Sequence, residues 1–258
     1  IRLGSIARVD VEIHFSLIGI IALVTWSLAE GLLPEQYPGW GSVEYWIVGF
    51  ICASMLITSV LVHELAHSLV AKARGFSVEG ILLFLFGGVS NLKADSKEPR
   101  DEFIIAGVGP LTSFALAGIF WISFTALPNK DMIPAGALWY LWLMNILLGA
   151  FNLIPAFPLD GGRMLRSAVW SVTGSFSRAT RIAARSGQGF GILMMAFGAA
   201  LALSGNIMGG LWFALIGWFL YRAAASTYRS PQQDRYLRPP ESENQNRYLD
   251  SAKSFKDS

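Results

Sequence analysis

The sequence has few of the residues on which soluble and disulfide-stabilised proteins depend. It contains one cysteine, Cys52, among 258 residues, so neither an intramolecular disulfide nor a cysteine-based zinc cluster can form within it. Only 15% of the residues are charged, whereas 53% are hydrophobic, and the mean hydropathy is +0.46. This composition is too apolar for a soluble domain and indicates a polytopic membrane protein.

Long apolar runs predict an all-α polytopic membrane fold with about six transmembrane helices. A helix needs roughly 20 apolar residues to cross hydrocarbon about 30 Å thick. Residues 1–12, before the first run, are expected to form a flank outside the membrane. The six runs cover approximately Ile13 to Leu33, Tyr45 to Ala73, Phe103 to Leu127, Ala137 to Ile154, Ser186 to Ser204 and Ile207 to Ala225.

The character of the chain changes after Tyr228. Residues 229–258 are rich in Ser, Asn, Gln, Pro and mixed charges and show almost no apolar periodicity, which is typical of a mobile polar segment. We therefore expect one membrane domain over residues 1–228, followed by a polar cytosolic tail or linker over residues 229–258.

The distribution of Lys and Arg predicts the orientation in the membrane. Basic residues lie before the first run, between the second and third runs, between the fourth and fifth, and after the sixth. The loops on the opposite side, 34–44, 128–136 and 204–206, contain only Lys130. Since positive residues stay on the cytoplasmic side, both termini are expected to be cytoplasmic.

The second apolar run contains His63, Glu64 and His67, which are unusual residues at this depth. Two histidines four residues apart lie on one helical face and can bind one metal ion, with the glutamate near the ion's open position. Burying ionisable groups in a membrane is costly, so they indicate a functional site. At 1.5 Å per residue, His67 lies about 7–8 Å from the cytoplasmic end of this helix.

A catalytic zinc ion takes three protein ligands and keeps one position open for water. The remaining histidine, His14, begins the first run and is better explained as a polar residue near the interface. Asp160 is the better candidate for the third ligand. It lies in the segment 152–162, where prolines break the fourth run and glycines allow close backbone approach. Irregular backbone at membrane depth is tolerated where it lines a cavity within the protein.

Together, the two motifs resemble the site-2 protease family of intramembrane zinc metalloproteases, over roughly residues 10–225. The resemblance rests on His63-Glu64-Leu65-Ala66-His67 and on Asn152-x-x-Pro155-x-x-Pro158-Leu159-Asp160-Gly161. It implies one catalytic Zn²⁺, with Glu64 as general base and with Asn152 holding the substrate backbone or the developing oxyanion. The zinc ligands that it implies are His63, His67 and Asp160.

The same resemblance implies the function and the partners. Residues 1–228 would be an intramembrane metalloprotease domain that hydrolyses peptide bonds within or near transmembrane segments of membrane-anchored regulatory proteins, in regulated intramembrane proteolysis. The expected partners are a transmembrane protein substrate and the lipid bilayer, in the plasma (inner) membrane of a prokaryote. No nucleic-acid partner is expected, and the sequence does not predict an oligomeric state.

The segment from Gly75 to Leu92 predicts a small membrane-associated β-hairpin or sheet between the second and third helices. It is rich in strand formers and too glycine-rich to cross the membrane as a helix, and its turn is expected at residues 86–89. In relatives, such a sheet presents an edge to the substrate. Strand addition would satisfy the backbone groups that an unwound substrate helix exposes. Gly87 and Gly88 are therefore candidate substrate-contacting residues, and an ordinary interfacial hairpin is the alternative.

Three other functions fit the sequence less well. A metal-ion transporter would carry polar residues along several spans, whereas here they concentrate at one depth. A zinc protease acting on lipidated C-termini would draw a glutamate ligand from a later helix, and none is evident. A non-catalytic relative is disfavoured because every catalytic residue type is present.

A third glycine-containing motif, Gly107-x-Gly109-Pro110, lies inside the third apolar run. It lacks the strand–turn–helix setting that a phosphate-binding loop requires. We therefore interpret it as a site of tight helix packing or a kink.

Overall fold

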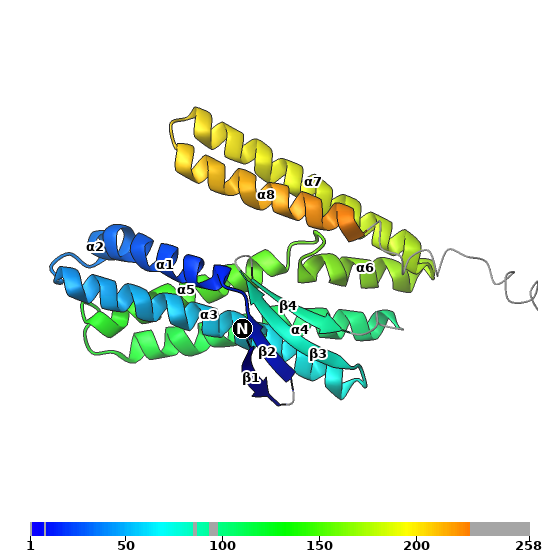
Figure 1. Cartoon of the computed structure of the whole chain (residues 1–258), viewed down its shortest axis with the longest axis horizontal. Helices are drawn as coiled ribbons and strands as arrows, with labels where there is room; N and C mark the ends of the chain where they lie inside the picture. The colour runs from blue at the N-terminus through cyan, green and yellow to red at the C-terminus, as the bar shows by residue number, and fades with distance from the viewer. Residues whose placement is uncertain (1, 8, 85–86, 93–97, 228–258) are drawn as a thin grey trace, which may run out of the picture.

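The structure is a computed structural model, and it describes residues 2–7, 9–84, 87–92 and 98–227 of the chain. Six helical segments in it are long and apolar enough to cross a membrane, which confirms the expected helix number. A small sheet lies beside them (Figure 1). Residues 229–258, expected to form a polar tail or linker, fall outside the described residues.

The helical segments follow the predicted runs closely. The first span, Ser16–Gln36, consists of α1 (Ser16–Ser27), a π-helical turn (Leu28–Leu32) and α2 (Leu33–Gln36). The others are α3 (Ser42–Ala73), α4 (Pro99–Ala126), α5 (Ile133–Asn152), α7 (Phe176–Leu203) and α8 (Ile207–Thr227). The largest difference is that α7 begins ten residues before the predicted run, because its first turns contain three arginines and are amphipathic rather than uniformly apolar.

The sheet has four strands and is larger than the sequence predicts. The expected hairpin is present as β3 (Val78–Phe84) and β4 (Gly87–Leu92), which pair antiparallel. The turn predicted at residues 86–89 is wrong in position, because residues 87–89 pair with β3 as part of β4. The flank expected at residues 1–12 instead contributes β1 (Arg2–Ile6) and β2 (Val9–Ile13). The strand order is β1-β2-β3-β4, with β2 parallel to β3. Consequently β4 is an edge strand among the described strands.

The inner face of the sheet packs on the helix that carries the two histidines. Val9 of β2 and Ile81 and Leu83 of β3 are buried in one hydrophobic cluster together with Leu17 of α1. Partly buried residues of α3 pack against this cluster, among them Ile57, Val60, Leu61 and Leu65. The sheet is thereby fixed beside the turn of α3 that bears His63 and His67.

A short amphipathic helix, α6 (Asp160–Thr173), follows α5 and was not expected from the sequence. Its mixed polar and apolar surface is the reason that a search for uninterrupted apolar runs misses it. The glycines at its start allow close approach to the preceding loop, as the sequence predicts. A Cβ atom on Gly161 would lie 2.2 Å from the Leu153 carbonyl oxygen. Asp160 is the first residue of α6.

The last two spans form a separate hairpin. In Figure 1, α7 and α8 lie side by side and away from the layer formed by α1, α3 and α5. Gly198 and Gly210 allow this close pairing, since a Cβ atom on either would lie 2.5 Å from the other's carbonyl oxygen. The hairpin connects to the rest of the described structure mainly through contacts between α6 and α7.

A buried ion pair joins α6 to α4. The Arg166 guanidinium donates through Nε to Glu102 Oε1 at 2.7 Å, and the two residues are 8% and 1% exposed. The same guanidinium lies over the rings of Phe157 and Phe176, at 5.4 and 4.9 Å from their centroids. These contacts fix the helix that begins with Asp160 against α4.

Removing one partner of this pair should be far more destabilising than breaking an exposed pair. In a Glu102→Ala variant, Arg166 would stay buried without a counter-charge, at a cost of about 3–5 kcal/mol. The matched control is Asp101→Ala, because Asp101 pairs with Arg74 at a partly exposed position and should cost no more than about 1 kcal/mol. Unfolding of the purified variants in detergent micelles measures the difference. Equal losses of stability in Glu102→Ala and Asp101→Ala would show that the buried pair stabilises the fold no more than the partly exposed pair does.

Candidate metal centre

Two ligand atoms of the candidate centre come from one face of α3. His63 and His67 are one helical turn apart, and their rings meet edge to face with centroids 4.9 Å apart. Their Nε2 atoms lie 3.2 Å from each other. Both residues are buried, with exposed fractions of 2% and 4%. The i, i+4 spacing therefore brings both imidazoles to one point, as the sequence predicts.

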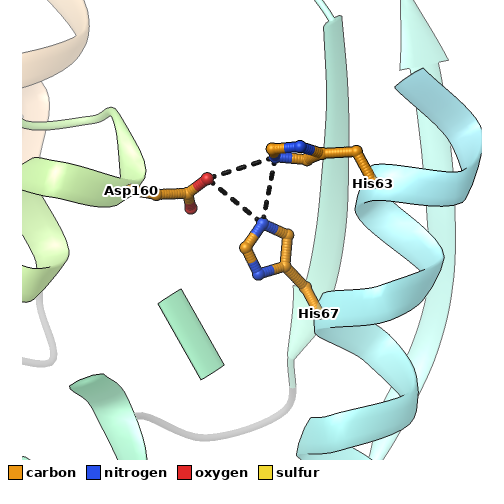
Figure 2. A group of neighbouring side chains, drawn as sticks. All are labelled: His63, His67 and Asp160. Atoms are coloured by element: carbon orange, nitrogen blue, oxygen red, sulfur yellow. Dashed lines mark hydrogen bonds and ion pairs between the residues drawn. The ribbon is translucent and has the colours of Figure 1, made fainter. Parts of the chain in front are cut away.

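The third atom comes from the first residue of α6. Asp160 Oδ2 lies 3.2 Å from the Nε2 atom of each histidine, and Asp160 is 8% exposed (Figure 2). Among the residues that the structure describes, these three form the group of His, Cys, Asp and Glu side chains placed to hold a metal ion. We call His63, His67 and Asp160 the ligand triad.

The dimensions of the ligand triad fit zinc. Zinc bound to nitrogen or oxygen at about 2.0–2.1 Å in tetrahedral geometry separates its ligand atoms by roughly 3.3 Å. The three separations in the triad are each 3.2 Å. Two imidazoles and one carboxylate are also a known type of catalytic zinc ligand set, which leaves one position open.

The charge state of Asp160 suits a metal ligand. Burial alone would raise the pKa of this carboxyl group, but the facing imidazoles of His63 and His67 lower the pKa below its usual range. A lowered pKa favours the ionised carboxylate, which is the form that binds a metal ion.

The outer nitrogens of both imidazoles contact α4. The His67 Nδ1–H donates to the Ile105 carbonyl oxygen at 2.5 Å. Because a carbonyl only accepts, this bond leaves the Nε2 lone pair directed at the centre of the triad. His63 Nδ1 lies 2.9 Å from Ser113 Oγ, and both residues are buried. Such outer partners orient metal-binding imidazoles. The sequence reasoning missed Ile105 and Ser113.

Glu64 lies half-buried on the same turn of α3, beside β4. A Cβ atom on Gly88 would lie only 2.3 Å from Glu64 Cγ and 2.9 Å from Cδ, so the backbone of β4 passes directly against this side chain. Gly87 precedes Gly88 in β4, where it is paired in register with Phe84 of β3. The structure therefore brings Gly88 next to the expected base.

The structure places the other two candidate residues outside the ligand triad. Asn152 is the last residue of α5, and its Nδ2 donates to the Leu148 carbonyl oxygen at 2.9 Å. His14 Nδ1 lies 2.8 Å from the hydroxyl of Ser16, at an exposed position before α1. This placement agrees with the interpretation of His14 as an interfacial residue rather than a ligand.

Comparison with known proteins identifies the family. The chain matches the sequence model of peptidase family M50 over residues 51–135 and 130–196. It is 43% identical over 226 residues to Rip3 of Mycobacterium tuberculosis, and 41% identical over 233 residues to a protein of Synechocystis. Both names describe zinc metalloproteases. These matches cover 87% and 90% of this chain but only 57% and 60% of the relatives, so the chain spans less than two thirds of their length.

A solved structure supports the same conclusion. The site-2 protease from Methanocaldococcus jannaschii matches with a TM-score of 0.62 and 35% sequence identity, over 89% of this chain and 95% of that chain. The chain belongs to peptidase family M50. The resemblance to site-2 proteases is confirmed, and together with six helices able to span a bilayer it makes this chain an integral membrane protein.

Proposed function

We propose that this chain is an intramembrane zinc metalloprotease that hydrolyses peptide bonds within or near transmembrane segments of membrane-anchored regulatory proteins. The observation that carries the proposal is the buried ligand triad, whose three ligand atoms are separated by 3.2 Å. The triad joins α3, which is long and apolar enough to cross a membrane, to α6. The family and the names of the relatives support the same chemistry.

Each polar residue of the site has a role in this reaction. His63, His67 and Asp160 would hold Zn²⁺, which supplies the Lewis acidity that activates water and polarises a carbonyl group. Glu64 would accept the proton of the attacking water and then transfer it to the leaving amine. Its position beside the triad, half-buried against Gly88, suits a base that must meet both water and substrate.

The edge strand β4 is the proposed binding surface for the substrate backbone. A transmembrane helix must unwind before hydrolysis, which frees N–H and C=O groups that need partners inside the membrane. Pairing with β4 would supply them, and the contact of Gly88 with Glu64 would then bring a substrate peptide bond close to the base. Gly87 and Gly88 place no side chain at the end of this strand that lies against Glu64. Asn152 would stabilise the oxyanion after its amide leaves the Leu148 carbonyl.

We also propose that both termini are cytoplasmic, in the plasma (inner) membrane of a prokaryote. The support is the concentration of Lys and Arg in loops on one side, against Lys130 alone in the opposite loops. Lys72, in the last turn of α3, lies on the basic side. The ligand triad would then lie within the membrane near the cytosol, where water can reach it.

Removal of zinc tests the proposed function. The purified chain is reconstituted into liposomes with solubilised membrane proteins, and new peptide termini are mapped by mass spectrometry. We expect cleavage sites within or next to apolar segments, loss of these sites after treatment with a zinc chelator, and their return when zinc is added. Cleavage that persists without zinc, or that occurs only in water-exposed domains, would contradict the proposal.

A further inference from the structure

Three positions on one face of α4 lie against the two imidazoles. Residues 105, 109 and 113 are spaced by four, so they lie one helical turn apart along the same side. Ile105 contacts His67 through its carbonyl oxygen, and Ser113 contacts His63 through its hydroxyl. The position between them is Gly109, which faces the ligand atoms themselves.

The space at Gly109 is too small for any side chain. A Cβ atom there would lie 2.1 Å from His67 Nε2 and 2.6 Å from His63 Nε2. Real Cβ atoms essentially never approach other heavy atoms within 3.0 Å. The atoms in the way are the two metal-facing nitrogens rather than the ends of flexible side chains. To reach 3.0 Å, the distance from an alanine Cβ to His67 Nε2 would have to grow by about 0.9 Å, and the distance to His63 Nε2 by about 0.4 Å.

The imidazoles have little freedom to make room. Each ring is held at Nδ1 by α4 itself, and its Nε2 atom lies 3.2 Å from Asp160 Oδ2. Metal–ligand distances tolerate deviations of only about 0.2 Å. A displacement large enough to admit a methyl group is thus incompatible with the ligand geometry, even if the helices keep their places.

The local sequence supports a functional reason for this glycine. Gly109 lies in the interior of α4 and is followed by Pro110, and both residue types weaken a helix. The close approach of the imidazoles explains why a residue without a side chain stands at this position despite its cost to the helix. By contrast, Gly107 on the same helix has open space, since a Cβ atom there would meet only Met164 Cε, at 3.9 Å.

We infer that Gly109 and Ser113 are positioning residues for the metal centre: Gly109 keeps the space between the imidazoles and α4 open, and Ser113 orients His63. The inference rests on the proposed function, because it assumes that the ligand triad binds zinc. It extends the site to α4, which contributes no ligand.

The test compares Gly109→Ala with Gly107→Ala in the purified full chain. We expect Gly109→Ala to weaken zinc binding by at least about 10–100-fold, and to change the visible absorption spectrum of the Co²⁺-substituted protein. Gly107→Ala should match the wild type in both measurements. Ser113→Ala, which removes atoms and creates no clash, should weaken zinc binding by about 10-fold. Thermal unfolding of each variant without metal checks that it remains folded at the temperature of the binding measurement.

Two outcomes separate this inference from the proposed function. Wild-type zinc affinity and an unchanged Co²⁺ spectrum in both Gly109→Ala and Ser113→Ala would overturn the positioning roles and leave the proposed function intact. A wild-type chain that binds no zinc would overturn the proposed function, and the positioning roles with it.

Discussion

A Glu64→Gln variant is expected to lose peptide-bond hydrolysis by about 10²–10⁴-fold while it keeps one zinc ion per chain. Removal of a general base costs a factor of this size. Glutamine has nearly the same shape, so it can occupy the space against Gly88 without disturbing His63 or His67. The measurement is the rate of substrate cleavage in liposomes, together with the zinc content of the same preparation.

The matched control for this experiment is Glu35→Gln. Glu35 lies in α2, outside the ligand triad, and the same change of charge there should leave hydrolysis at the wild-type rate. A Glu64→Gln variant that cleaves at more than half of the wild-type rate would remove Glu64 from the proposed role of base.

An Asp160→Ala variant should lose zinc as well as activity. In the proposed centre Asp160 would supply one of the four positions around the ion, and structural zinc sites with four ligands bind with about 10–16 kcal/mol. A quarter of this free energy corresponds to about 10²–10³-fold weaker binding. Competition with a chromogenic chelator measures the affinity. Asp160 Oδ2 lies 3.2 Å from the Nε2 atom of each imidazole. Each histidine would already fill its own position around the ion, so neither can replace Asp160.

His14→Ala is the control for this second experiment. It also removes a potential metal-binding side chain, but His14 is exposed and lies next to Ser16. The zinc affinity of the His14→Ala variant should equal that of the wild type. If Asp160→Ala bound zinc as tightly as His14→Ala does, Asp160 would not be a ligand.

Local patterns predict much of this fold. Each membrane-spanning helix needs its own apolar run, so the runs place the ends of all six spans to within about four residues, except for the start of α7. The two histidines are also a local signal, since their spacing alone puts them on one face of α3. Asp160 is 93 residues from His67, and its assignment depended on the broken helix of segment 152–162 and on the resemblance that the two motifs carry together.

The remaining features depend on contacts between segments distant in the sequence. Strand β2 has only five residues, and its partner β3 follows two spans later, so no local pattern shows the pairing. Helix α6 is amphipathic, and apolar runs alone do not detect it. The sequence marks Gly109 as a packing or kink position, but only the register of α4 against α3 shows that it faces the imidazoles.

X-ray absorption at the zinc K-edge of the purified full chain tests the proposed metal centre most directly. The ligand triad predicts four nitrogen or oxygen neighbours at about 2.0–2.1 Å, with outer-shell scattering from two imidazoles, of which a His67→Ala variant should retain one. A spectrum with fewer than two imidazoles in the wild type, or one that His67→Ala leaves unchanged, would contradict the proposed centre.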